Sequence, residues 1–391
     1  MTVTEIAQKA KQTALKLQSL PEDQRVKALN ALGHALLKNS AMILEANAKD
    51  LAAAKKSKLS AAMVDRLTLS EKSIQGLKEM CTSIAAQPRV VGQIVEEFTR
   101  PNGLRIQKQR IPIGVIGMIF ESRPNVLIDG AALAIKSGNA IILKGGKEAQ
   151  YSNRALMDVI EESVFKILPE GCISLIETRE DVTELLKLNQ YIDLMVPRGG
   201  SALIDHVRKN ATMPVVAHDK GLCHIYVHKD ADVKRVIPII LNAKVSRPGV
   251  CNAVETLLIH TDYPEKDQVI AALKAESVEI RETFDTEYLD KIISLKIVSD
   301  EYEAISHIQQ YGSHHTEAIL AKDYKVIELF MNSLDASAIV VNASTRFNDG
   351  GELGLGAELG ISTSKLHAYG PMGAKEMTTT RFLVTGNGQI R

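Results

Sequence analysis

The stretch that decides the fold is IPIGVIGMIF at residues 111–120, followed directly by the polar turn ESRPN at 121–125. A short apolar run of this kind is typical of a strand buried on both faces of a parallel sheet. Downstream of it, strand-like and helix-like stretches alternate. This alternation predicts a mainly parallel, doubly wound sheet. We expect strands at 140–144, 174–177, 192–196, 214–217 and 224–228, separated by helices at about 128–137, 151–167, 180–189 and 200–210.

The flanking regions complete an α/β fold class. The first 88 residues are predicted to be helical, and the polar stretch at 104–110 and the segment at 381–385 to be strands. A second α/β region follows a polar boundary near residue 230. Its expected strands lie at 255–260, 294–298, 317–321 and 338–342, with helices near 265–275, 301–311 and 323–334.

Composition excludes several classes of protein. Of the 391 residues, 45% are hydrophobic and 24% charged, which is ordinary for a soluble globular chain. The 47 basic and 47 acidic residues cancel, there is no Trp, and aromatics make up 4%, so neither phosphate-backbone binding nor base stacking is expected. No apolar run is long enough to span a membrane, and no signal peptide begins the chain. We expect a cytoplasmic protein with no nucleic-acid or membrane partner.

Two common motifs are absent or incomplete. No GxGxxG follows a strand, and GGKE at 145–148 lacks the Ser or Thr and the first glycine of a phosphate-binding P-loop. A short cluster of possible zinc ligands is formed by His218, Cys223, His224 and His228. On a strand His224 and His228 share a face while Cys223 points away, and no fourth ligand has tetrahedral spacing. We therefore expect no metal.

Four segments combine strand ends with small, polar or cationic residues, at 114–126, 141–149, 196–201 and 242–256. The last carries Cys251 just after a Pro-Gly break and close to Lys244 and Arg247. Cationic neighbours and a helix start would favour the reactive thiolate, whereas an arbitrary cysteine is more often a small buried hydrophobe. Arginines in such turns suit anion recognition, with surface ion pairing as the alternative, and the four concerned are Arg123, Arg198, Arg247 and Arg346.

Taken together, these segments resemble the aldehyde dehydrogenase superfamily. The resemblance rests on GVIGMIFESRPNV, SGNAIILKGGKEA, MVPRGG, CHIYV, NAKVSRPGVCNAVETLL, VNASTRFNDGG and LGLGAELGISTSKLHAYGPMG, in family order over nearly the whole chain. It implies two doubly wound α/β domains plus a small β oligomerisation flap. Residues 1–225, completed by 345–391, would bind NADP, with flap strands near 104–110 and 381–391. Residues 226–344 would form the catalytic domain.

The PRGG and STRFNDGG segments are similar to a branch of the family that reduces an acyl phosphate. The resemblance therefore implies NADPH-dependent reduction of L-glutamyl 5-phosphate to L-glutamate 5-semialdehyde and phosphate, the second step of proline synthesis from glutamate. Cys251 would be the nucleophile and would carry a thioester. A homodimer or homotetramer is implied, and a separate glutamate 5-kinase as a partner.

The resemblance also implies roles for other residues. Asn125 and the Cys251 N–H would stabilise the oxyanion. Lys144 would hold the adenosine ribose, and Glu287 the nicotinamide ribose. Lys147 would favour the 2′-phosphate of NADP, where an acidic residue would repel it. Gly199 and Gly200, which open a helix, would also contact the cofactor, while the arginines that would bind the substrate anions are Arg123, Arg198, Arg247 and Arg346.

Three other interpretations stay open from the sequence. A general NAD(P)-dependent aldehyde oxidase would need a base that activates water, and the usual glutamate is replaced at residues 217–221, where His218 is the one alternative base. A binding or assembly protein would have an unreactive Cys251. A zinc-dependent dehydrogenase would use the histidine cluster near residue 224.

Overall fold

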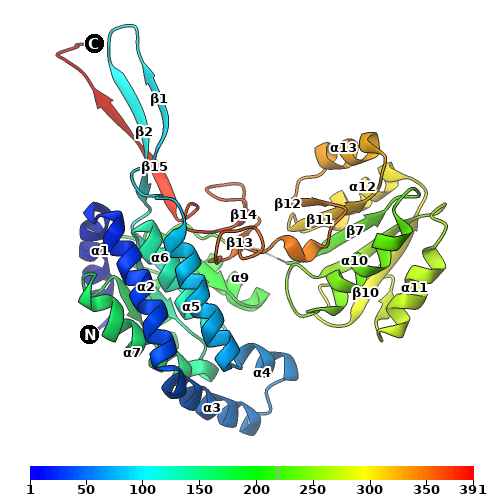
Figure 1. The fold of residues 1–391 in the computed structure, drawn as a ribbon, viewed down its shortest axis with the longest axis horizontal. Helices are drawn as coiled ribbons and strands as arrows, with labels where there is room; N and C mark the ends of the chain where they lie inside the picture. Colours follow the sequence, from blue (N-terminus) through cyan, green and yellow to red (C-terminus); the bar gives the residue numbers. More distant parts are fainter. Residues whose placement is uncertain (218–219) are drawn as a thin grey trace. The chain divides into compact units, whose positions relative to one another are not determined.

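The computed structural model describes residues 1–217 and 220–391, apart from the side chains of residues 61 and 62. The chain divides into two compact units, which Figure 1 shows. Unit 1 comprises Met1–Val216, Gly354–Gly360 and Met372–Arg391, and unit 2 comprises Ala217–Leu353 and Ile361–Pro371. The assignment of residues 1–225 and 345–391 to cofactor binding, and of 226–344 to catalysis, stays a prediction.

A four-stranded parallel sheet forms the centre of unit 1. Its order is β5-β4-β3-β6, so the chain winds outward from β3 in both directions, as a doubly wound sheet requires. All residues of β3 and the first four of β4 are buried. The strands are β3 (Val115–Phe120), β4 (Ala140–Lys144), β5 (Ile173–Leu175) and β6 (Leu194–Arg198).

Helices cover this sheet and form the N-terminal part of the chain. The prediction that residues 1 to 88 are helical is confirmed by five helices. Helix α6, which connects β3 to β4, is almost entirely buried and ends at Gly138, whose φ of +72° suits a glycine cap. The helices of unit 1 are α1 (Val3–Ser19), α2 (Glu22–Lys38), α3 (Ser40–Lys56), α4 (Ala61–Leu67), α5 (Glu71–Ala86), α6 (Asn125–Ser137), α7 (Gln150–Ser163), α8 (Arg179–Leu185) and α9 (Ser201–Asn210), with short 3₁₀ turns η1 (Lys147–Ala149) and η2 (Val164–Lys166).

Two details of the predicted strands were wrong. The run at 111–120 is not one strand, because β2 ends at Pro112 and β3 begins at Val115, with Gly114 at a φ of +133° between them. The expected strand at 214–217 is reduced to one bridge between Met195 and Val215.

An antiparallel three-stranded sheet, here called the flap, extends from unit 1 (Figure 1). It consists of β1 (Ile94–Thr99), β2 (Arg105–Pro112) and β15 (Thr378–Thr385), with β2 in the middle. Every residue of β1 is exposed, and its sequence, IVEEFT, does not alternate between apolar and polar residues as a half-buried strand would. Large apolar side chains are nevertheless exposed on the flap, namely Ile94, Val95, Phe98, Phe382 and Val384.

Unit 2 is built on six parallel strands in the order β12-β11-β7-β8-β10-β9. Successive residues of β7 face two separate hydrophobic cores, with Ile225 and Val227 in one and Tyr226 in the other. Two buried faces require helices on both sides. The strands are β7 (Cys223–Val227), β8 (Val254–His260), β9 (Glu279–Arg281), β10 (Ile292–Val298), β11 (Thr316–Leu320) and β12 (Ala338–Val341).

Four helices pack on this sheet, and all but α10 were expected. Residues of α10 and α11 belong to the first core, and residues of α12 and α13 to the second. A 3₁₀ turn and a two-stranded antiparallel ribbon complete the unit. These elements are α10 (Val233–Val245), α11 (Lys266–Ala275), α12 (Glu301–Tyr311), α13 (Tyr324–Ser333), η3 (Thr345–Phe347), β13 (Ile361–Ser362) and β14 (Gly370–Pro371). Within the described residues, no helix has the length and apolar character needed to cross a bilayer.

Candidate active site

The turns that follow β3 and β6 meet at the point where the strand order of unit 1 reverses. The Glu121 N–H donates to the Arg198 carbonyl at 3.1 Å, and the Gly200 N–H donates to Glu121 Oε2 at 2.9 Å. The predicted residues Gly199 and Gly200 therefore open α9, whose first N–H groups favour anions. Sequence reasoning missed that the Glu121 carboxylate already contacts this helix start.

A second carboxylate ties the β3 turn to the β4 turn. Glu148 Oε1 accepts hydrogen bonds from both the N–H and the hydroxyl of Ser122, each at 2.7 Å. Ser122 has a φ of +45°, which is unusual for a residue other than glycine. These two bonds offset that strain and hold the turn that leads to Arg123 and Asn125.

Three predicted residues of unit 1 gather around Asp129. Asn125 donates through Nδ2 to Asp129 Oδ2 at 3.1 Å, and Arg198 forms an ion pair with Glu358 at 3.1 Å. Burial raises the pKa of Asp129 to about 7, while Arg198, Asn125 and Arg123 oppose the rise. The arrangement is a partly buried cluster of mixed charge, in which the predicted oxyanion donor Asn125 is held by a carboxyl group.

A pocket of about 340 Å³ lies where β4 and β5 end. Gly145 and Gly146 line it, and a side chain at either position would displace a polar side chain: an added Cβ would lie 2.1 Å from Asn153 Nδ2 at Gly145 and 2.0 Å from Glu148 Oε1 at Gly146. Such backbone lets a ligand approach closely. The lining residues are Gly145, Gly146, Lys147, Gln150, Tyr151, Asn153, Arg154, Leu175, Ile176 and Glu177.

The charges around this pocket suit a nucleotide. Exposed Lys147 lines it, as does Arg154 from α7, which sequence reasoning missed. Lys144, the last residue of β4, is half-buried; burial lowers its pKa and Glu148 opposes this. A glycine-lined hollow with cations at the carboxyl ends of parallel strands fits a ribose and phosphate groups.

Cys251 differs from the other cysteines by being accessible. None of the four forms a disulfide, and Cys251 alone is partly exposed. Burial raises the pKa of Cys81 and Cys172 to about 12 and that of Cys223 well above its ordinary value. Because the thiolate is the reactive form of cysteine, the three buried thiols are poor nucleophiles.

The backbone of Cys251 is tightly enclosed. It lies in a turn before β8, so the helix start expected there is wrong, and the residue sits at the amino-terminal edge of the sheet. A Cβ added to Gly221 would lie 2.1 Å from the Cys251 carbonyl oxygen, and the Cys223 thiol donates to the same oxygen at 3.1 Å. These contacts hold the main chain that presents the sulfur.

Asn252, next to Cys251 in the chain, binds the segment that carries Arg346. Its Nδ2 donates to the carbonyls of Arg346 and Asn348, at 3.3 and 3.0 Å, and its Oδ1 accepts from Arg346 Nη1. Burial lowers the pKa of Arg346, Arg247 lowers it further, and Asp349 and Cys251 oppose this. The predicted residue Arg346 is thus close enough to both Arg247 and Cys251 for its charge to interact with each of them.

The remaining predicted residue of unit 2, Glu287, also joins this group. Its Oε1 accepts the Gly221 N–H at 2.9 Å. Gly221 therefore links Glu287 to the backbone of Cys251. The spacing of 36 positions along the sequence carries no signal for this proximity, which comes from folding.

The histidine cluster has protein partners in the structure. His224 Nδ1 lies 3.0 Å from Glu317, and His228 Nδ1 lies 2.6 Å from Asp230. His218 lies outside the described residues. Within residues 1–217 and 220–391, no three His, Cys, Asp or Glu side chains are grouped to hold a metal ion.

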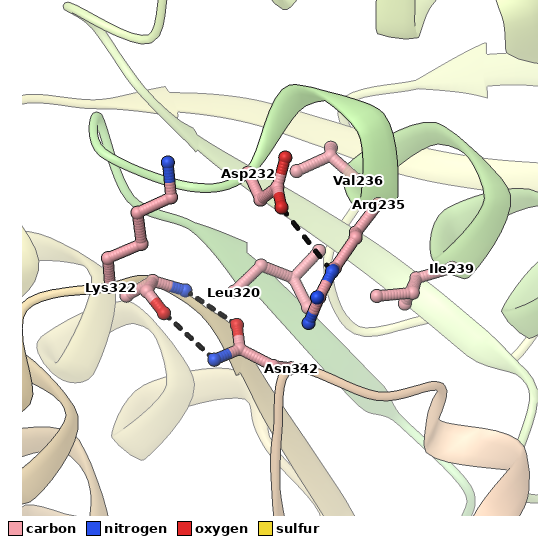
Figure 2. A pocket seen from close by; sticks show the side chains of 8 residues that line it. Asp232, Arg235, Val236, Ile239, Leu320, Lys322 and Asn342 are labelled. Carbon is pink, nitrogen blue, oxygen red and sulfur yellow. Dashed lines mark hydrogen bonds and ion pairs between the residues drawn. The ribbon is translucent and has the colours of Figure 1, made fainter.

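A pocket of about 250 Å³ occupies the opposite, carboxyl-terminal edge of unit 2's sheet, where β11 and β12 end (Figure 2). Arg235 pairs with Asp232 at 3.3 Å, and the Asn342 amide forms two hydrogen bonds with the backbone of Ala321. The polar groups of Asp232, Arg235 and Asn342 are thus already paired within the protein. They do not need a ligand to complete their hydrogen bonds.

Comparison with known proteins agrees with these features. Residues 1–288 match the sequence model of the Aldehyde dehydrogenase family. Gamma-glutamyl phosphate reductase of Nautilia profundicola is 48% identical over 410 residues, covering 99% of each chain. The crystal structure of gamma-glutamyl phosphate reductase from Thermotoga maritima has a TM-score of 0.95 at 39% identity and full coverage of both chains. An engineered glycolyl-CoA reductase with bound NADP⁺ shares only the fold, at 14% identity and a TM-score of 0.75 over 98% of this chain and 96% of that one.

The match to the family model spans most of the chain, and the match to the reductases spans nearly all of it. The resemblance inferred from the sequence motifs is confirmed, as is the α/β fold class. The chain belongs to the aldehyde dehydrogenase family and, within it, to the gamma-glutamyl phosphate reductases.

Proposed function

We propose that the protein reduces L-glutamyl 5-phosphate to L-glutamate 5-semialdehyde and phosphate with NADPH, as the second step of proline biosynthesis. The observation that carries this proposal is the one accessible thiol, Cys251, held by its backbone beside Arg247 and Arg346 in a chain that belongs to the reductase family. An accessible thiolate next to cations is suited to attack an anionic acyl phosphate.

The chemistry proceeds through a thioester on Cys251. The thiolate attacks the acyl carbon, a C–S bond forms, and the C–O bond to phosphate breaks as phosphate leaves. NADPH, when bound, supplies a hydride. The reduced thioester carbon then expels the Cys251 thiolate and becomes the aldehyde. The Cys251 N–H and Asn125 are proposed to stabilise the oxyanions formed on the way.

The proposed cofactor-binding residues are those that the family resemblance implies. Lys144, Lys147, Gly199 and Gly200 would hold the adenosine and phosphate groups, and Glu287 the nicotinamide ribose. The glycine-lined pocket after β4 supports this assignment, and a protein of the same fold has been solved with bound NADP⁺. Lys147 and Arg154 on the pocket wall support NADPH over NADH, because the additional 2′-phosphate carries negative charge.

The substrate carries phosphate and carboxylate groups, for which arginine is the preferred partner. We propose Arg123, Arg198, Arg247 and Arg346 for these groups. Arg346 is supported by its charge interaction with Cys251, and Arg247 by its charge interaction with Arg346. Arg198 forms an ion pair with Glu358, so it would have to exchange or share that partner on binding substrate.

The proposal extends to the assembly and the location of the protein. The exposed apolar residues of β1 and β15 support pairing of flaps between subunits in a homodimer or homotetramer. Association with a separate glutamate 5-kinase, in the cytoplasm, is proposed because acyl phosphates are labile in water.

The test is the reverse reaction, followed as NADPH formed from glutamate 5-semialdehyde, phosphate and NADP⁺. Cys251→Ala is expected to lower kcat by at least about 10³-fold, while Cys172→Ala, which removes a buried thiol, stays active. NADPH formation that does not depend on phosphate would instead indicate a general aldehyde oxidase. Full activity of Cys251→Ala would refute the proposed nucleophile, and no turnover in the wild-type protein would favour a binding role.

A further inference from the structure

A buried ion pair closes the base of the segment that carries Cys251. Lys244 lies in the last turn of α10 and Glu255 is the second residue of β8, and their Nζ and Oε2 atoms are 3.0 Å apart. The two side chains are 0% and 1% exposed. Since Cys251 lies between them in the chain, the pair connects both ends of the nucleophile's turn.

Glu255 also receives two consecutive backbone N–H groups. The N–H of Tyr288 donates to Oε2 at 3.3 Å, and that of Leu289 donates to Oε1 at 3.4 Å. Leu289 has a φ of +54°, a conformation in which neighbouring N–H groups can converge on one anion. Burial raises the pKa of Glu255 to about 7, and Lys244 and these two N–H groups oppose the rise. The carboxylate and the strained turn therefore stabilise each other.

The turn at 288–289 leads back to Cys251. Its preceding residue, Glu287, accepts the Gly221 N–H at 2.9 Å, and Gly221 packs against the Cys251 carbonyl. The contacts thus run in a closed ring from Lys244 through Glu255, the 287–289 turn and Gly221 to the segment of Cys251. Neither Lys244 nor Glu255 has been given a role in the reaction.

We propose that Lys244 and Glu255 are positioning residues that set the Glu287 carboxylate relative to Cys251 and thereby control the affinity for NADPH. This inference rests on the proposed function, in which Glu287 holds the nicotinamide ribose. A purely structural ion pair behaves differently, because replacing both partners by apolar side chains of similar volume is often neutral.

The test uses the double variant Lys244→Met/Glu255→Leu in the full-length protein. Fluorescence titration is expected to show NADPH binding about tenfold weaker, since two charge-assisted hydrogen bonds to the turn are lost. Hydrogen–deuterium exchange read by mass spectrometry is expected to be faster in the peptide that contains residues 287–289. Glu255→Gln is the second variant, in case the double variant fails to fold. It keeps the side-chain volume and an acceptor oxygen, so we expect a smaller loss of NADPH affinity and a smaller increase in exchange.

The matched control is Lys136→Met/Glu22→Leu, which removes a largely buried lysine–glutamate pair of unit 1 with a contact of 2.7 Å. It is expected to leave exchange at 287–289 unchanged. Unchanged exchange and affinity in the Lys244/Glu255 variants would overturn the positioning role, while a Glu287→Gln variant that binds NADPH weakly would keep the assignment of Glu287 intact. If Glu287→Gln bound NADPH normally, that assignment would fail and the positioning role with it.

Discussion

The two units are both parallel α/β sheets, yet their candidate site residues lie at opposite edges. In unit 1, Lys144 and Arg198 are the last residues of β4 and β6, and Asn125 follows β3. In unit 2, Cys251 precedes β8, while the carboxyl-terminal edge holds the pocket of Figure 2.

This difference has a chemical reason. A nucleotide is bound through phosphates and hydroxyls, so helix starts and glycine turns at the carboxyl-terminal edge serve it. A nucleophile needs an accessible sulfur on a backbone that cannot shift. The proposed nucleophile of unit 2, Cys251, lies in a close-packed turn, in which Gly221 touches the Cys251 backbone and Asn252 binds the η3 segment.

The strongest test of this comparison is Gly221→Ala. The added methyl group would lie 2.1 Å from the Cys251 carbonyl oxygen and 2.7 Å from its Cα, and backbone atoms cannot yield as a flexible side chain does. We expect kcat/KM to fall about 10²-fold through displacement of the sulfur, measured in the reverse assay. Gly76→Ala in α5 is the control, because nothing lies within 4 Å of its added methyl group. Wild-type kcat/KM in Gly221→Ala would show that the turn is not held this way.

The next largest effect concerns the edge of unit 1. Lys147→Glu places an acidic group on the pocket wall, and we expect kcat/KM with NADPH to fall about tenfold relative to NADH. The measurement is steady-state kinetics with both cofactors. Lys72→Glu, at an exposed lysine of α5, is the charge-matched control. An unchanged ratio between the cofactors would remove Lys147 from cofactor selection.

A third prediction concerns Asp129, a half-buried carboxyl group of unit 1. Asp129 in unit 1 has a pKa raised from 3.8 to about 7, so the proton is held more tightly in the folded protein than in the unfolded chain. Its contribution to stability is complete below the unfolded pKa and is lost as pH rises through about 7. Asparagine does not titrate, so Asp129→Asn avoids this loss. Relative to wild type, its free energy of unfolding should therefore be about 2 kcal/mol higher at about pH 8 than at about pH 5.

Urea denaturation at the two pH values measures this gain. Asp158→Asn on α7, where the side chain is 53% exposed, is the control and should show no comparable pH dependence. If the two units unfold in separate transitions, the effect should be confined to that of unit 1. An equal gain in the control would mean that the burial of Asp129 does not cause the pH dependence.

The smallest expected effect is at the carboxyl-terminal edge of unit 2. Arg235→Ala removes an exposed ion pair with Asp232, and Lys322→Ala removes a second cation from the same pocket. Each should change the free energy of unfolding by less than about 0.5 kcal/mol and kcat/KM by less than about twofold. A large loss of kcat/KM would indicate that this edge binds a reactant as well.

The elements that could be predicted from sequence include the strands with two buried faces, the N-terminal helices and two strands of the flap. Strands β4, β7, β8 and β11 are rich in apolar residues, are almost entirely buried and lie close to the expected positions. Helix α10 was missed because Pro238 lies inside it, and prolines usually mark helix ends. Strand β1 was missed because its apolar residues do not alternate with polar ones, and β9 because it has only three residues. Both depend on pairing with a neighbouring strand, β1 with β2 and β9 with β10.

The sequence by itself determined the fold class, the family and the candidate residues, because apolar periodicity and local motifs are properties of neighbouring positions in the chain. Only the tertiary structure decided which cysteine is accessible and that Gly221 contacts both Glu287 and the Cys251 backbone. It also decided that Lys244 and Glu255 form a buried ion pair. These facts depend on contacts between segments far apart in the chain, and burial and charge at such contacts arise only when the segments pack together.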